Sequence, residues 1–188
     1  YGETTVDWRM IVNKGIGALK KEAEEALATL DDAVPGDLEK SFFYKSEIMV
    51  ADAIIHLSHR HADLAEKMAA ECADEVRKAE LLKIAEVCRW VPEHPARNFY
   101  EACQSILSYE YACYMEQNAS SYNLGRLDQY LYPFFKADKE AGILTDDGAQ
   151  ELLDYIAVGT DDRLFAIAEL IYHGTDLGVI CNATKIDM

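Results

Sequence analysis

Apolar and polar residues alternate along most of the chain with the period of an α-helix. In the first thirty residues Asp7 stands where an N-cap would stand, and Gly15 and Gly17 weaken the pattern locally. The sequence therefore predicts one helix over residues 8–30. Its apolar positions fall near a 3.6-residue period at Ile11, Ile16, Leu19, Ala23 and Leu27.

Further helices follow from the same periodicity and from end signals. They are expected over residues 38–72, 74–91, 96–118 and 146–158, in the segment "FFKADKEAG" that ends at Gly142, and within the C-terminal stretch that starts at residue 163. Pro35 and Pro95 are interpreted as first-turn residues of the helices that follow them, Gly142 as a C-cap and Thr145 as an N-cap. The one β-like run is "GVIC" at residues 178–181. The predicted fold is mainly α, with little or no strand before residue 177.

The middle of the second predicted helix, "IMVADAIIHL" at residues 48–57, is apolar on nearly every face. A helix of that kind is normally buried on all sides. A chain of 188 residues cannot easily wrap one helix so completely. The pattern indicates that the chain belongs to a larger body.

Composition narrows the class of protein. With 18 Lys and Arg against 34 Asp and Glu, the formal net charge is −16, which disfavours nucleic acid and anionic membrane as partners. No apolar run is long enough to span a bilayer, and "YGETTVDWRM" does not resemble a signal peptide. Five widely spaced cysteines without a CxxC pair are typical of a reducing, cytoplasmic setting.

General sequence motifs supply no catalytic residue and no metal site. His56, His59 and His61 could in part share a helix face, but no HExxH pattern accompanies them, so we interpret them as surface or helix-end residues. GxSxG, P-loop and GxGxxG motifs are absent from the sequence.

One segment does not fit a plain helix or a plain loop. It is "NASSYNLGRLDQYLYPFF", residues 118–135, in which two serines precede a glycine, an ion-pair candidate and a run of aromatic residues. Gly125 can supply a backbone bend that a Cβ would resist. Arg126 and Asp128 can form a charge-assisted anchor. We therefore expect Gly125, Arg126 and Asp128 to have a structural role.

This segment and the helix before it resemble the N-terminal half of glycyl radical enzymes. The resemblance is to the pyruvate formate-lyase-like group that contains glycerol dehydratase, choline trimethylamine-lyase, hydroxyproline dehydratase and arylacetate decarboxylases, and it covers about residues 5–155. The matching residues are Pro95, Ala96, Arg97, Phe99, Tyr100, Glu101, Ala102, Leu124, Gly125, Arg126, Asp128, Gln129, Tyr130, Tyr132 and Pro133.

The resemblance implies a fold, a chemistry and a partner. Residues 1–155 would be part of a pyruvate formate-lyase-like domain, the helical N-terminal region of an α/β barrel, and residues 156–188 a poorly matched helix and short strand. The parent enzyme would be anaerobic, cytoplasmic and homo-oligomeric. It would carry a glycyl radical installed by a radical S-adenosylmethionine activating enzyme, and cleave a C–O, C–N or C–C bond of a small substrate. By the same resemblance, Ser120 and Ser121 would face that substrate.

Two departures from the family limit what this chain could do alone. The family's Cys-x-Glu and Arg-Val-x-Gly-Tyr motifs, which carry the thiyl and glycyl radicals, are absent from the 188 residues. The expected role is scaffold and substrate wall, with no cofactor in the chain itself. Two alternatives stay open: a serine-rich turn without a ligand role, and a non-catalytic helical binding or regulatory domain.

Overall fold

The structure, a computed structural model, describes residues 4–31, 33–117 and 122–159. Within these residues the predicted mainly α fold is confirmed, and the two strands have only two residues each. The elements are β1 Thr4–Thr5, α1 Trp8–Lys14, α2 Ile16–Ala28, α3 Asp37–Glu71, α4 Glu75–Trp90, α5 Phe99–Gln117, β2 Tyr122–Asn123, α6 Leu127–Tyr130, α7 Tyr132–Glu140 and α8 Asp146–Gly159. The predicted strand at residues 178–181 lies outside the described residues.

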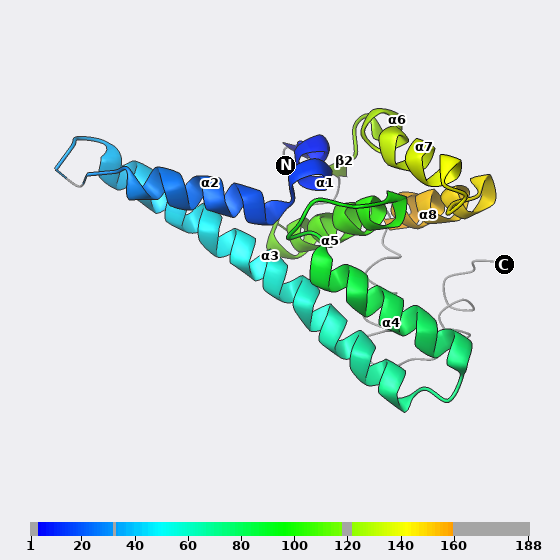
Figure 1. Ribbon diagram of the computed structural model, residues 1–188. Helices are drawn as coiled ribbons and strands as arrows, with labels where there is room; N and C mark the ends of the chain where they lie inside the picture. The colour runs from blue at the N-terminus through cyan, green and yellow to red at the C-terminus, as the bar shows by residue number, and fades with distance from the viewer. Residues whose placement is uncertain (1–3, 32, 118–121, 160–188) are drawn as a thin grey trace.

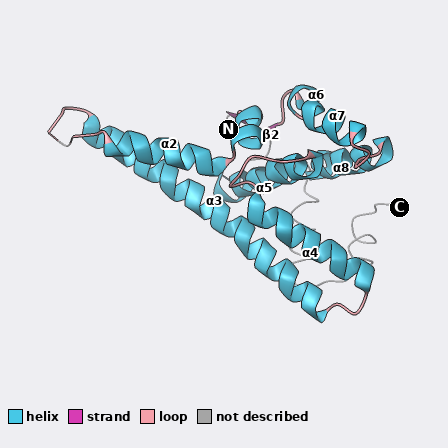
Figure 2. Cartoon of the chain, viewed as in Figure 1, coloured by secondary structure: helices cyan, strands magenta, loops and turns pink. Residues whose placement is uncertain are grey.

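Helix α3 is the spine of the molecule (Figure 1). Its first half forms a hairpin with α2, its second half packs along α4, and α5 crosses it near the middle. Helices α1, α6, α7 and α8 gather around α5, so the described chain has a helical body from which the α2–α3 hairpin projects (Figure 2).

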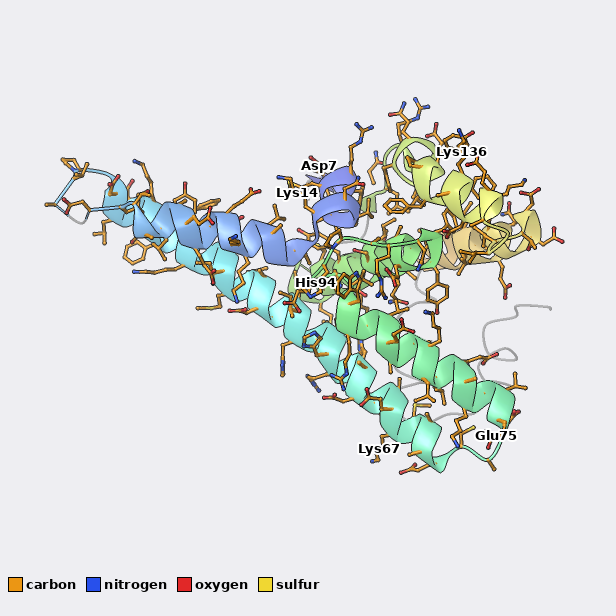
Figure 3. All side chains as sticks on the ribbon, in the orientation of Figure 1. Asp7, Lys14, Lys67, Glu75, His94 and Lys136 are labelled. Atoms are coloured by element: carbon orange, nitrogen blue, oxygen red, sulfur yellow. The ribbon has the colours of Figure 1, made fainter. Side chains whose placement is uncertain are left out.

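Several helix ends lie where the sequence predicts them. The Asp7 carboxylate accepts a hydrogen bond from the Met10 amide at 3.1 Å and caps α1. The Thr145 hydroxyl accepts one from the Gly148 amide at 3.1 Å and caps α8. Figure 3 marks Asp7 and Lys14 at the two ends of α1. Gly142, just past α7, has a φ of +70° and donates to Lys139, as expected for a residue that ends a helix.

The predicted single helix over residues 8–30 is wrong, because the chain breaks at Gly15. The amides of Ile16 and Gly17 donate to the carbonyl oxygens of Pro92 and Glu93 at 2.8 and 2.9 Å, instead of continuing the α1 ladder. Gly15 has a φ of +77°, and a Cβ there would lie 2.3 Å from the Glu93 carbonyl oxygen. The close approach of the residue 92–94 loop therefore requires the break.

The two prolines expected in first turns lie before their helices. Pro35 precedes Gly36, which has a φ of +91° and stands at the N-cap of α3. Pro95 lies in a loop, and the Asn98 side chain accepts a hydrogen bond from the Glu101 amide at 2.9 Å at the start of α5. A side-chain cap and a glycine turn thus set these helix starts.

The body has a larger core and the spine has two smaller ones. The main core joins α1, α5, α6 and α8 around Trp8, Ile106, Tyr130 and Ile156. Small residues, including Ala62 and Ala85, allow α3 and α4 to approach closely. A separate cluster of Ile11, Ile16, Ala51 and Ile54 joins the α1–α2 corner to α3.

The apolar stretch at the middle of α3 is covered on one side only. Ala51 and Ile54 are buried, whereas the side chains of Met49 and Val50 are 71% and 52% exposed. The full burial expected from the sequence is therefore not reached within the described residues. A broad apolar face on α3 favours a chain that is part of a larger body over an autonomous domain.

Candidate functional site

The two serines proposed to face a substrate, Ser120 and Ser121, lie outside the described residues. The structure does describe the frame on both sides of them. Helix α5 ends at Gln117 on one side, and β2 begins at Tyr122 on the other. The contacts of this frame can be described on both sides of the two serines.

Strand β2 is fixed by the N-terminal part of the chain. It pairs with β1 in parallel, with Thr4 opposite Tyr122 and Thr5 opposite Asn123. The indole nitrogen of Trp8 also donates a hydrogen bond to the Asn123 carbonyl oxygen at 2.9 Å. Because Trp8 is itself buried in the main core, β2 is attached to the rigid body of the molecule.

After β2 the chain makes a tight turn at Gly125. The Gly125 amide donates to the Asn123 side-chain oxygen at 2.7 Å, and Gly125 has a φ of +62°. A Cβ at this position would meet nothing within 4 Å, so glycine is favoured by its backbone conformation and not by a close neighbour. The buried Tyr130 hydroxyl then donates to the Leu124 carbonyl oxygen at 2.9 Å and ties the turn to α6.

Arg126 and Asp128 form the predicted pair, but the pair lies on the surface. The guanidinium binds both carboxylate oxygens, at 2.8 and 2.6 Å. This hydrogen bonding lowers the pKa of Asp128. The side chains are 70% and 62% exposed, and the aromatic run does not cover them. Their role as an anchor stays a prediction, and the contribution expected from such an exposed pair is small.

The aromatic run attaches α6 and α7 to α5 instead. The rings of Phe99 and Phe135 meet edge to face with centroids 6.0 Å apart. The Asp138 carboxylate accepts a hydrogen bond from the Phe99 amide at 2.8 Å. Tyr130 is buried, whereas Tyr132 is exposed. Residues 127–138 thus pack against the first turn of α5 through Phe135 and bond to it through Asp138.

A groove of about 520 Å³ lies between α6, α7 and α8. Its floor is apolar, with Leu131, Phe135 and Leu153 among its lining residues. The acidic residues at its rim have partners, since Asp146 pairs with Lys139 and Asp154 accepts from Gln150. The groove is therefore large enough to receive a small molecule, but the acidic groups described at its rim are already paired and do not form a polar binding site.

Sequence reasoning missed one buried acid close to this frame. The side chain of Glu110 on α5 is fully buried, and neither of its carboxylate oxygens has a hydrogen-bond partner among the described residues. Burial raises its pKa to about 7. The signal was available in the sequence, because Cys103, Glu110 and Tyr114 recur at core spacing along α5.

Neither a metal centre nor a nucleophile is assembled in the part of the chain that is described. No group of three His, Cys, Asp or Glu residues there could hold a metal ion. Cys72, Cys88 and Cys103 form no disulfide among the described residues, and burial raises the pKa of Cys88 and Cys103. Among the described helices, none is long and apolar enough to cross a membrane.

Comparison with known proteins places these features in a family. The profile described as "Pyruvate formate lyase-like" matches residues 1–177. The chain belongs to the pyruvate formate lyase-like family. The mainly helical structure is accordingly the N-terminal region of a glycyl radical enzyme fold, as the resemblance predicted.

Two named relatives and one solved structure show which known proteins this pyruvate formate lyase-like chain is similar to. Isethionate sulfite-lyase of Bilophila wadsworthia is 47% identical over 155 residues, which are 81% of this chain and 19% of that protein. Trans-4-hydroxy-L-proline dehydratase of Clostridioides difficile is 38% identical over 82% of this chain and 20% of its own length. The crystal structure of a glycyl radical enzyme from Archaeoglobus fulgidus matches with a TM-score of 0.79 and 32% identity, over 87% of this chain and 22% of that one.

The chain spans about a fifth of the length of the curated relatives it matches. Three further proteins named isethionate sulfite-lyase, from Oleidesulfovibrio alaskensis, Desulfovibrio desulfuricans and Nitratidesulfovibrio vulgaris, are 41–44% identical to it. The family profile extends beyond residue 155, whereas the boundary predicted there stays a prediction.

Proposed function

We propose that this chain is the N-terminal helical part of a glycyl radical lyase that releases sulfite from a small hydroxyalkyl sulfonate such as isethionate. One observation carries the choice of substrate. Four relatives named isethionate sulfite-lyase are 41–47% identical to the chain, whereas the hydroxyproline dehydratase is 38% identical. The bond cleaved would then be C–S, which replaces the C–O, C–N or C–C bonds expected from the resemblance alone.

The contribution of this chain to such a reaction is to position the substrate. The radical carriers would lie in the rest of the parent enzyme and would supply hydrogen-atom abstraction. Here, β1, Trp8 and Tyr130 fix the chain from Asn123 to Leu124. Ser120 and Ser121 stand between α5 and β2 in the sequence, and their proposed role is to donate hydrogen bonds from their hydroxyl groups to an anionic or hydroxylated substrate.

The proposed location, oligomeric state and activating partner of the parent enzyme follow from its similarity to glycyl radical enzymes. The parent enzyme would be a cytoplasmic, anaerobic homo-oligomer that depends on an activating enzyme of the radical S-adenosylmethionine class. The exposed apolar side of α3 supports a chain that needs further protein to cover it. An autonomous helical binding or regulatory domain, the alternative, would be expected to bury that face by itself.

The test is an assay of the parent enzyme encoded by the complete reading frame. After anaerobic activation, sulfite release from isethionate should far exceed turnover of trans-4-hydroxyproline, glycerol or choline at equal concentration. Ser120→Ala and Ser121→Ala should raise KM more than they lower kcat if the hydroxyl groups bind the ground state and the transition state equally. Preferred turnover of one of the other substrates, by loss of water or of trimethylamine, would overturn the sulfonate assignment, and unchanged kinetics in both variants would leave the serines without a ligand role.

The 188-residue chain alone is predicted to carry no radical and no lyase activity, because it lacks both radical motifs. Anaerobic incubation with an activating enzyme and S-adenosylmethionine, followed by EPR spectroscopy, measures this directly. The full-length parent, treated in parallel, is the positive control. A glycyl doublet from the short chain would contradict the prediction.

A further inference from the structure

Glu110 lies on the face of α5 that is turned toward the core of the body. Residues 103, 107, 110 and 114 are spaced by three or four positions and so share one side of this helix. The Glu110 side chain is 0% exposed, and both of its oxygens lack a hydrogen-bond partner among the described residues. An ionised carboxylate without a partner is strongly disfavoured in such a place.

The ionisable groups around Glu110 that the electrostatics identify cannot neutralise it. Tyr130 on α6 interacts electrostatically with Glu110, and Cys103 on α5 lies near the same tyrosine; burial raises the pKa of Tyr130 and of Cys103, so both are uncharged near neutral pH. The Tyr130 hydroxyl already donates to Leu124. Among the charged groups on helices packed against α5, Arg9, Lys14 and Glu151 are exposed. Glu86, Asp138 and Asp154 have partners of their own, and the half-buried Glu47 lies near Tyr109.

We propose that Glu110 is a proton-dependent switch in the core of this chain. With its proton bound, Glu110 is neutral and α6 packs on α5. When the proton leaves, a buried charge faces Tyr130, the packing of α6 loosens, and so does the turn at residues 122–126 that Tyr130 holds. The switch is a property of the chain itself and does not depend on the activity proposed for the parent enzyme.

The sign of the pH dependence follows from burial. The pKa of Glu110 is raised from 4.5 to about 7, so the folded chain retains a proton that the unfolded chain has already released. The contribution of this group to stability is full below the unfolded pKa and is lost as the pH rises through about 7. Lowering the pH in this range should therefore tighten the structure around α6.

The experiment compares urea unfolding of the wild-type chain and of Glu110→Gln at constant ionic strength. Gln has the shape of the neutral acid and no charge to lose. From about pH 5 to about pH 8, the folded-to-unfolded ratio of the wild type should fall by a factor of roughly ten to a hundred relative to Glu110→Gln. Glu151→Gln, which removes an exposed carboxylate from α8, is the charge control and should follow the wild type. Parallel pH profiles for the wild type and Glu110→Gln would overturn the proposal.

A second measurement locates the effect and covers a variant that fails to fold. At about pH 8, hydrogen exchange in peptides covering residues 122–131 should be slower in Glu110→Gln than in the wild type, and at about pH 5 the two should agree. If Glu110→Gln does not fold, carbon-13 NMR of glutamate-labelled wild type decides instead. One carboxyl titrating near pH 7 supports the switch, and titration of every carboxyl below about pH 5.5 overturns it.

Discussion

Two arginine–carboxylate pairs in this chain share the same chemistry and have different surroundings. In the first, both Arg126 and Asp128 are mostly exposed. In the second, Glu101 is fully buried and accepts hydrogen bonds from the Arg97 backbone amide at 2.8 Å and from its guanidinium. Burial decides how much each pair contributes, because water replaces the lost partner at the surface and cannot do so in the core.

Substitution of one acid in each pair should separate the two cases. We expect Asp128→Ala to lower the free energy of unfolding by less than about 1 kcal/mol. Glu101→Ala should lower it by about 2–3 kcal/mol, since the partly buried Arg97 amide loses its acceptor in the core while the guanidinium turns to solvent. A loss of about 3–5 kcal/mol would be expected for Asp128→Ala only if its pair with Arg126 were buried. Urea denaturation of the two variants measures both quantities, and equal losses would refute the argument.

At the residue scale, the sequence predicted which residues pair with each other better than it predicted which residues are buried. It paired Arg126 with Asp128 and assigned a bend to Gly125, both of which the geometry bears out. It could not show that the pair is exposed, because exposure depends on how α6 and α7 pack on α5. The spacing of Glu110 marks a core position in the sequence, but whether a partner reaches its carboxylate is known only once the helices around α5 are placed.

Helix boundaries depend on local signals and on loops distant in sequence. The caps Asp7 and Thr145 act within one turn, so the sequence suffices to predict them. The break between α1 and α2 requires the carbonyl groups of residues 92–94, which follow α4. Gly15 and Gly17 show in the sequence that the helical pattern is weak at this point. The helix breaks there because the amides of Ile16 and Gly17 bond to the carbonyl groups of Pro92 and Glu93.

Gly15→Ala and Gly36→Ala test this interpretation as a matched pair. Both glycines have a positive φ, of +77° and +91°, but only Gly15 lies against another backbone, while a Cβ at Gly36 would meet nothing within 4 Å. Gly36→Ala should cost about 1–2 kcal/mol from the backbone conformation alone. Gly15→Ala should cost clearly more, because the Glu93 carbonyl would have to move. Thermal unfolding measures the difference, and equal melting temperatures would show that the close approach at Gly15 is unimportant.

At the scale of the whole molecule, the α2–α3 hairpin extends beyond the body (Figure 1). The part of α3 in this hairpin carries exposed apolar side chains, namely Leu38, Phe42, Phe43, Met49 and Val50. Composition and periodicity predicted the mainly α fold and the long helices α3, α4, α5 and α8, but not the break between α1 and α2. They did not predict which face would stay open, because the neighbours that cover a helix are set by the complete fold and not by the helix itself.

The open face of α3 leads to a prediction about association. Monomeric proteins rarely expose contiguous apolar patches beyond about 300–600 Å², so the isolated chain should self-associate through this face. The net charge of −16 opposes unspecific clumping and favours a defined oligomer. Salt screens repulsion between the acidic surfaces over about 8 Å at physiological ionic strength, so association should strengthen from low to moderate salt.

Sedimentation velocity over a series of protein and salt concentrations measures this association. Phe43→Ser combined with Met49→Ser should shift the chain toward the monomer, because it removes the two most exposed of these side chains, at 65% and 71%. Val76→Ser on α4 is the matched control, since Val76 is 71% exposed but lies outside the hairpin, and it should leave association unchanged. If the wild-type chain is strictly monomeric and binds no apolar dye, the α3 face needs no cover, and the autonomous-domain alternative gains.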